Sequence, residues 1–205
     1  AVTLTTDYRR GWTDTPIETL DRALVLARKA VALDESVPQT HWALSFTYLS
    51  RKEYDKAERV AEHAIDIAPN YADGYGLLAL IDAYLGRAES SLEFNDKATR
   101  LNPFYTFEYL ISYGIAHYTL GDYATAIEKL EEAQQRNENS VPVKLLLAAS
   151  YIRANQKDDA EWTTLQLQIL SPVATISALD KTIPIAMPEL KRMLLEDLRK
   201  ARLPE

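Results

Sequence analysis

Residues 38–71 read PQTHWALSFTYLSRKEYDKAERVAEHAIDIAPNY, and two helical patterns follow one another in them. Large apolar side chains cover one broad side of residues 38–50, and after a break at Arg51–Lys52 apolar and small side chains recur every three or four residues. The second pattern contains Ala57, Ala61 and Ala64. Because short side chains let two antiparallel helices approach closely, the stretch predicts a packed helix pair.

The same pattern recurs along the chain at a spacing of about 34 residues. Pro69 and Pro103 are 34 residues apart, and Pro172 follows at 69 residues further on. The three alanine positions recur as Ala23, Ala27 and Ala30; Ser91, Asn95 and Ala98; Ala126, Leu130 and Ala133; and Ala160, Thr164 and Leu167. We predict five units at about 4–37, 38–71, 72–106, 107–140 and 141–172. Since no unit closes its own core, stacking into an all-α solenoid is expected.

The composition excludes several classes of protein. The 205 residues include no cysteine, which excludes disulfides, thiolate nucleophiles and thiolate zinc sites. The 23 Lys and Arg against 30 Asp and Glu give a net charge of −7, which disfavours nucleic acid and anionic membranes as partners. No apolar run reaches the roughly 18–20 residues of a membrane span, and residues 1–10 show no signal-peptide pattern. We predict a cytoplasmic location, with the periplasm left open.

The candidate catalytic residues form no catalytic pattern. His41, His63 and His117 include no pair at the i, i+4 spacing of helical metal sites. The neighbouring carboxylates Glu131–Glu132 and Asp158–Asp159 point in different directions on a helix, so neither forms an acid–base pair. Neither glycine-rich phosphate-binding motif occurs. We therefore predict that the protein is not an enzyme and has no catalytic residues, metal or cofactor.

Residues 173–205 follow the fifth unit and are predicted to close the array. Residues 173–188 hold apolar side chains around Pro184 and Pro188, and we expect this connection to fold against the fifth unit. Residues 189–202 are expected to form a capping helix, because the end of a stacked array needs a polar outer face. That face is predicted to consist of Glu189, Lys191, Arg192, Glu196, Asp197, Arg199, Lys200 and Arg202.

The repeated residues resemble those of the tetratricopeptide repeat family over essentially the whole chain. The matching residues are clearest in the second unit, at Leu44, Tyr48, Ala57, Ala61, Ala64 and Pro69, with Gly86, Gly114 and Gly121 at family-like places further on. The resemblance implies a right-handed solenoid whose first helices line a concave groove that accepts a peptide or helix. Residues 198–205 resemble the end of repeat modules attached to bacterial class III adenylyl/guanylyl cyclases and winged-helix regulators, which implies a regulatory or scaffolding part of a larger bacterial protein.

Projecting the sequence onto this geometry gives a candidate groove lining that is apolar and aromatic with few charges. The groove residues are predicted to be Gln39, Trp42, Phe46, Leu49, Asp73, Leu80, Tyr84, Glu108, Ile111, Ile115, Tyr118, Ile152 and Arg153. An exposed apolar surface of this extent is typical of an interaction site. Family members that bind chaperone tails clamp a carboxylate with Lys, Arg and Asn. The equivalent positions here hold Trp42, Phe46, Leu77, Glu108 and Ser112, which argues against that activity.

The sequence favours a non-catalytic interaction module that binds an apolar or amphipathic segment of a protein or peptide partner in the groove. Trp42, Phe46, Tyr84 and Tyr118 are the expected anchors, because aromatic side chains dominate the energetics of such contacts. The alternative function is self-association, with a homodimer formed through the outer helices or the cap. A further alternative is that the groove residues pack on one another, on residues 173–188 or on a second copy.

Overall fold

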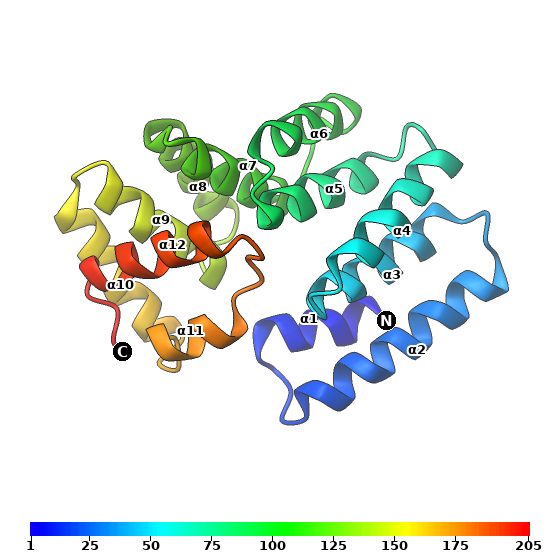
Figure 1. The fold of residues 1–205 in the computed structure, drawn as a ribbon, viewed down its shortest axis with the longest axis horizontal. Helices are drawn as coiled ribbons and strands as arrows, with labels where there is room; N and C mark the ends of the chain where they lie inside the picture. Colours follow the sequence, from blue (N-terminus) through cyan, green and yellow to red (C-terminus); the bar gives the residue numbers. More distant parts are fainter.

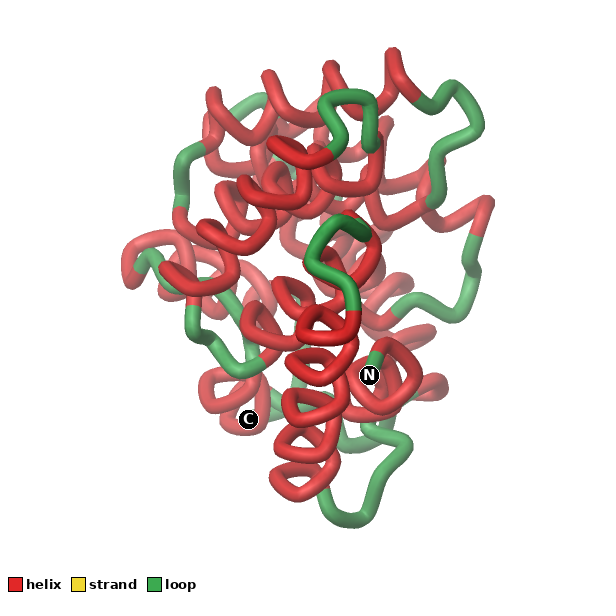
Figure 2. Tube along the Cα trace, turned by 90° about the vertical axis from the view of Figure 1, so that its right-hand side faces the viewer, coloured by secondary structure: helices red, strands yellow, loops and turns green.

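The computed structural model describes all of residues 1–205 and consists of twelve helices joined by short loops (Figure 1). The helices are α1 (Val2–Arg10), α2 (Pro16–Leu33), α3 (Pro38–Ser50), α4 (Tyr54–Ile67), α5 (Ala72–Leu85), α6 (Ala88–Leu101), α7 (Phe107–Leu120), α8 (Tyr123–Arg136), α9 (Val141–Arg153), α10 (Lys157–Leu170), α11 (Ile176–Thr182) and α12 (Pro188–Lys200). Figure 2 shows helices and loops and no strand. The predicted all-α class is therefore confirmed.

The first ten helices form five pairs that stack in chain order. The first helices of the pairs (α1, α3, α5, α7 and α9) contact one another in sequence, whereas α2, α4, α6 and α8 each contact their own first helix and that of the next pair. In Figure 1 the pairs follow an arc from the blue α1 and α2 to the yellow α9 and α10. The first helices form the inner surface of this arc, and the second helices form its outer surface. The arrangement is the predicted α-solenoid.

The turn inside each of the four regular pairs depends on one residue in the left-handed conformation. Gly86 (φ 77°) and Gly121 (φ 79°) end α5 and α7, where glycine carries no side-chain penalty. Lys52 (φ 60°) and Asn155 (φ 61°) occupy the corresponding turns after α3 and α9. The left-handed backbone conformation of the turn is therefore the same in all four pairs, although the residue at that position is Lys, Gly or Asn.

Within each pair, the two helices interlock through side chains of complementary size. A Cβ atom added at Gly114 in α7 would lie 2.5 Å from Leu130 of α8, so only glycine allows this approach. In the preceding pair, Ala79 replaces the glycine and Asn95 replaces the leucine, and both are fully buried. The Asn95 side-chain oxygen accepts a hydrogen bond from Ser112 Oγ at 2.9 Å, while its amide nitrogen has no partner. Small and large residues thus alternate across the pair contact.

The segment after α10 departs from the expected arrangement. Ala174, Ile176 and Leu179 are buried, but residues 176–182 form the helix α11, and the chain then leaves the fifth pair. The Ala186 N–H donates to the Tyr84 carbonyl of α5 at 2.8 Å, and Tyr54 Oη of α4 donates to the Pro184 carbonyl at 2.9 Å. Residues 183–187 therefore pack on the second and third pairs, which brings the end of the array back to its first half.

The helix α12 crosses the inner surface instead of extending the stack. Its N-cap residue Met187 lies beside Gly86 at the end of α5, and the helix passes Thr119 of α7 and reaches Arg153 of α9. In Figure 1 the red and orange α12 lies within the arc, in front of the yellow-green pairs. No helix combines the length and the apolar character that a membrane span requires.

Candidate functional site

The candidate site is the inner surface, to which each pair contributes one first helix. Local sequence fixes where these helices begin, because Pro38 of α3 and Pro142 of α9 occupy the first helical turn, where the missing N–H group is not needed. The helices α3, α5, α7 and α9 then lie side by side in chain order. Two parts of this surface differ in their accessibility.

The open part centres on a stacked pair of aromatic rings on α3. The rings of Trp42 and Phe46 are parallel to within 16°, with centroids 5.1 Å apart, and both side chains are half-buried. Trp42 Nε1 donates a hydrogen bond to the Asp73 carbonyl of α5 at 3.1 Å, which fixes the indole across two pairs. Gln39, one turn before Trp42, is exposed. In the open part, the aromatic rings of Trp42 and Phe46 therefore lie next to the polar side chain of Gln39.

A carboxylate and a phenol continue this surface onto α7. Tyr109 Oη donates to Asp73 Oδ1 at 2.6 Å, and the neighbouring Glu108 is exposed. Burial and this hydrogen bond raise the pKa of Tyr109, so its hydroxyl stays protonated and remains a donor. Gly76 leaves room for the Tyr109 ring, since a Cβ atom there would lie 2.7 Å from Tyr109 Cε1. Asp73 and Glu108 give this side of the open part a negative character.

The rest of the inner surface is covered by the ends of the chain itself. Leu49, Leu80, Tyr84, Ile111, Ile115 and Tyr118 are all buried. At the border with the open part, Arg9 of α1 lies over the Phe46 ring at 5.1 Å and donates to Tyr84 Oη at 3.3 Å. From the C-terminal side, residues 183–187 pack on Tyr84 and α12 lies over α7 and α9. The chain thus occupies much of its own groove.

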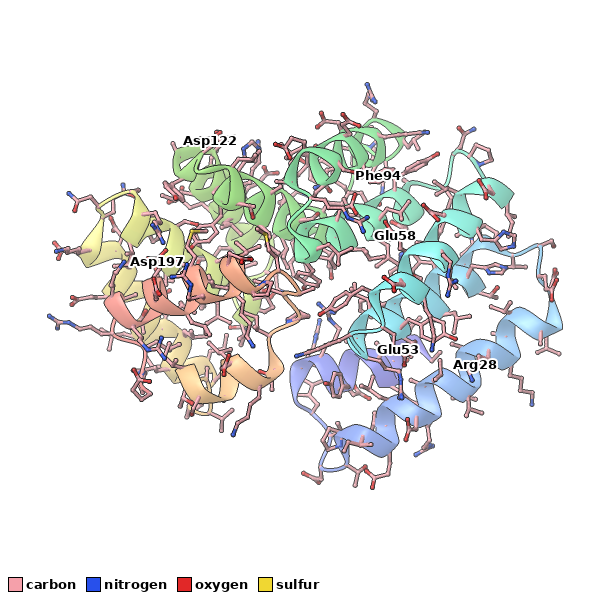
Figure 3. The ribbon with its side chains drawn as sticks, in the orientation of Figure 1. Arg28, Glu53, Glu58, Phe94, Asp122 and Asp197 are labelled. Atoms are coloured by element: carbon pink, nitrogen blue, oxygen red, sulfur yellow. The ribbon has the colours of Figure 1, made fainter.

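Two predicted groove residues bind a carboxylate of α12. Asp197 is fully buried, and its Oδ2 accepts a hydrogen bond from Tyr118 Oη at 2.6 Å and pairs with Arg153 Nε. Its other oxygen, Oδ1, lies 3.2 Å from Lys200 Nζ. Figure 3 labels Asp197 on α12. Burial, followed by the hydrogen bond to Asp197, raises the pKa of Tyr118 and keeps its hydroxyl a donor. The groove therefore holds an amphipathic helix through a buried, charge-assisted contact.

The structure brings the predicted residues together in two groups. Trp42, Phe46 and Asp73 are in contact in the open part, whereas Tyr118 and Arg153 meet on Asp197 in the covered part. Gln39 and Glu108 are exposed at the edge of the open part, and Ile152 is half-buried beside Arg153. The apolar residues Leu49, Leu80, Ile111 and Ile115 are buried.

Sequence reasoning raised packing of the groove residues on residues 173–188 as an alternative, and residues 183–187 do pack on Tyr84, but it missed the covering by α12 and by Arg9. Asp197 was expected on the polar outer face of the capping helix, and this expectation is wrong, because its side chain is fully buried. The sequence contained an indication of this burial, because Asp197 lies three residues after Leu194 and seven after Leu190, on the apolar face of the helix. Arg9 gave no comparable signal, since its partner Tyr84 is 75 residues away.

The histidines take structural positions. The rings of His41 and His63 meet edge to face with centroids 4.7 Å apart, and His41 Nε2 lies 2.9 Å from the Glu35 carbonyl. His117 Nδ1 lies 3.1 Å from Asp122 Oδ2 at the turn into α8. No group of three or more His, Asp or Glu side chains is arranged to hold a metal ion. The inner surface is thus the candidate site that the structure offers.

Comparison with known proteins identifies the repeat. Family models of the tetratricopeptide repeat match residues 38–71 and 118–168. Among solved structures, the protein TTC0263 of Thermus thermophilus, a thermophilic tetratricopeptide repeat protein, is 19% identical with a TM-score of 0.67, over 96% of this chain and 99% of that one. PilW, a type IV pilus biogenesis factor, is 20% identical with a TM-score of 0.68, over 97% of this chain and 90% of that one.

A third structure belongs to YrrB, described as a tetratricopeptide repeat protein with an unusual peptide-binding site. It is 17% identical with a TM-score of 0.56, over 85% of this chain and 90% of that one. At these identities the likeness shows a shared fold. The comparison with curated protein sequences found no match.

Proposed function

Because this chain is built of tetratricopeptide repeats, we propose that it is a non-catalytic interaction scaffold that binds an amphipathic segment of a protein partner on the open part of its inner surface. The observation that carries the proposal is the stacked, half-buried pair Trp42 and Phe46. Aromatic rings held rigid on a concave surface lose little conformational freedom on binding, which makes them effective anchors.

The surroundings of the aromatic pair define the chemistry of the partner segment. An apolar side chain would pack on the Trp42 ring, while a Lys or Arg of the same segment would face the exposed carboxylates of Asp73 and Glu108. The chain's own Arg9 already places a guanidinium over the other ring, that of Phe46. We therefore propose a partner segment that combines apolar and basic residues at helical spacing.

Two observations support binding of a segment and not of a small molecule. The covered part of the same surface already accommodates α12, an amphipathic helix of this chain, through its buried Leu190, Leu194 and Leu198. YrrB, which shares the fold, is described as having a peptide-binding site. We further propose, from the resemblance of residues 198–205 to cyclase and regulator modules, that the scaffold is a regulatory part of a larger bacterial protein.

The test is selection of peptides from a random displayed library on the full chain, followed by titration of the selected peptides. The Trp42→Ala, Phe46→Ala double variant is expected to bind them at least about tenfold more weakly, because losing two aromatic anchors costs about 2 kcal/mol or more. Helical content is expected to be unchanged by circular dichroism, since both rings are partly exposed.

The matched control is Trp12→Ala, which removes a tryptophan ring that is 67% exposed in the loop between α1 and α2. This variant is expected to bind the selected peptides as the wild type does. Equal affinity of the wild type and the Trp42→Ala, Phe46→Ala variant would refute the proposal.

A further inference from the structure

A positively charged cavity lies at the C-terminal end of the array, where the ends of α9 and α12 meet the start of α10. This C-terminal cavity has a volume of about 560 Å³. Four cationic side chains and two carboxylates line it, which leaves a net charge of +2 in a chain whose net charge is −7. A cavity lined mainly by one sign of charge concentrates ions of the opposite sign. The cations are Arg153, Lys157, Lys200 and Arg202, and the carboxylates are Glu161 and Asp197.

The repeat shows that two of these cations are not required by the fold. Arg153 lies two residues before Asn155, the left-handed residue of the turn, and Lys157 lies two residues after it. The other regular pairs have no cation at either position. Their residues are Ser50, Tyr84 and Thr119 before the left-handed residue, and Tyr54, Ala88 and Tyr123 after it.

The helix dipole does not account for Lys157 either. This residue is the first of α10, and a cation is unfavourable beside the positive end of a helix. Its side chain is exposed and pairs with no carboxylate of the chain. A bound anion would explain an unpaired ammonium group at this place.

The two arginines of the C-terminal cavity keep donors available. Arg153 pairs with Asp197 through Nε, and Arg202 pairs with Glu161 through Nε at 3.0 Å. The terminal nitrogens of both guanidinium groups have no hydrogen-bond partner in the chain. Two N–H groups of one guanidinium match two oxygens of a phosphate group. The cavity therefore combines free donors with an uncompensated positive charge.

The backbone at Arg202 is a further departure. Its φ of 65° lies in the left-handed region, which residues with a side chain rarely adopt. The other residues of this kind, Lys52 and Asn155, form the turns inside pairs, whereas Arg202 follows α12. Residues held in such conformations occur preferentially at ligand-binding sites.

We propose that the C-terminal cavity binds a phosphate group, either as the free ion or as part of a small polar molecule. A phosphate monoester carries a charge of about −1.5 to −2 at pH 7, which matches the +2 of the lining. The volume lies within the roughly 300–1,000 Å³ of small-molecule sites. Ile152 is the one apolar residue of the lining, so the rest of such a molecule is polar, as in a sugar phosphate.

Isothermal titration of the full chain tests the proposal with three probes at constant ionic strength. The probes are glucose 6-phosphate, inorganic phosphate and glucose. Glucose 6-phosphate is expected to bind and glucose is not, because only the first carries the anion. Inorganic phosphate that binds as tightly as glucose 6-phosphate would identify the free ion as the ligand, and weaker binding would identify an ester. Absence of binding of both phosphates up to about 10 mM, or equal binding of glucose, would overturn the proposal.

Two variants locate the binding in the cavity. Lys157→Gln removes the unpaired cation and is expected to weaken phosphate binding about tenfold. Arg202→Gly is expected to weaken it at least as much, because it also leaves Glu161 without its partner, and glycine favours the backbone conformation at this position.

The matched control is Lys29→Gln, which removes an exposed cation of α2 and is expected to bind phosphate as the wild type does. Circular dichroism is expected to show the same helical content for all variants. Equal affinities of Lys157→Gln and Lys29→Gln would refute the site. The Trp42→Ala, Phe46→Ala variant should bind phosphate normally, which separates this proposal from the groove.

Discussion

Lys144 carries an ammonium group into the interior of the solenoid. The residue is only 6% exposed on α9, and its Nζ donates one hydrogen bond, to Gln166 Oε1 of α10 at 3.0 Å. Burial lowers the pKa of Lys144 from its ordinary value of 10.5, since the charged form loses its hydration. An apolar side chain of similar length would fill the same space without this cost.

We predict that Lys144→Met stabilises the protein by about 1 kcal/mol at neutral pH and raises the Tm by roughly 2–4 °C. Because the folded-state pKa lies below 10.5, folding favours the neutral amine, and the wild type gains stability as the pH rises through that pKa. The advantage of the variant should therefore shrink as the pH approaches about 10.5.

Thermal unfolding followed by circular dichroism at several pH values measures this difference. The control is Lys29→Met, which changes an exposed lysine of α2 and is expected to leave the Tm nearly unchanged. A destabilised Lys144→Met variant, or an advantage independent of pH, would contradict the prediction.

At the scale of the element, α12 is held by one buried carboxylate as well as by its leucines. Asp197→Ala removes the acceptor of Tyr118 Oη and the partner of Arg153 and Lys200. We predict a loss of about 2–3 kcal/mol, which is less than the roughly 3–5 kcal/mol of a fully buried broken ion pair, because Arg153 and Lys200 are partly in contact with water. Hydrogen exchange of the α12 amides is expected to accelerate more than that of α5 or α7.

Glu196→Ala is the neighbouring control. Glu196 pairs with Arg192 at 3.0 Å on the solvent side of α12, and exposed pairs of this kind contribute about 0–1 kcal/mol. The prediction fails if the two variants lose similar protection in α12, since Asp197 would then play no special part in holding the helix.

At the scale of the whole molecule, residues 183–187 join the end of the array to its first half, and Gly86 is central to that contact. A Cβ atom at Gly86 would overlap Sδ of Met187, whereas one at Gly121 would meet nothing closer than 3.9 Å. Both glycines have positive φ values, 77° and 79°, so alanine carries the same backbone cost at either position. The two substitutions differ only in the displacement of Met187.

We predict that Gly86→Ala destabilises the protein by about 1–3 kcal/mol more than Gly121→Ala does, which is the usual cost of inserting a methyl group into a filled space. Small-angle X-ray scattering should show a larger radius of gyration for Gly86→Ala alone, because the C-terminal segment separates from α5. Identical stability and size for the two variants would show that this contact does not hold the arc together.

The helix pairs and their stacking follow from the amino-acid sequence without the structure. Residues such as Ala57, Ala61 and Gly114 act on neighbours in the same pair, so the information is local and repeats at a fixed spacing. Trp162, Leu165 and Ile169 recur at helical spacing in the sequence, but this spacing does not distinguish a buried face of a helix from an exposed one. Only the structure shows that these three side chains of α10 are exposed.

Which part of the groove is open depends on contacts that form only in the folded chain. The covering contacts join residues far apart in the chain: Arg9 reaches Tyr84 across 75 residues, and Tyr118 reaches Asp197 across 79. Whether such residues meet depends on the curvature accumulated over several pairs, and small rotations at each pair add up along the array. The repeat of about 34 residues specifies how one pair packs on the next. It does not specify the relative position of the first and last pairs in the folded array.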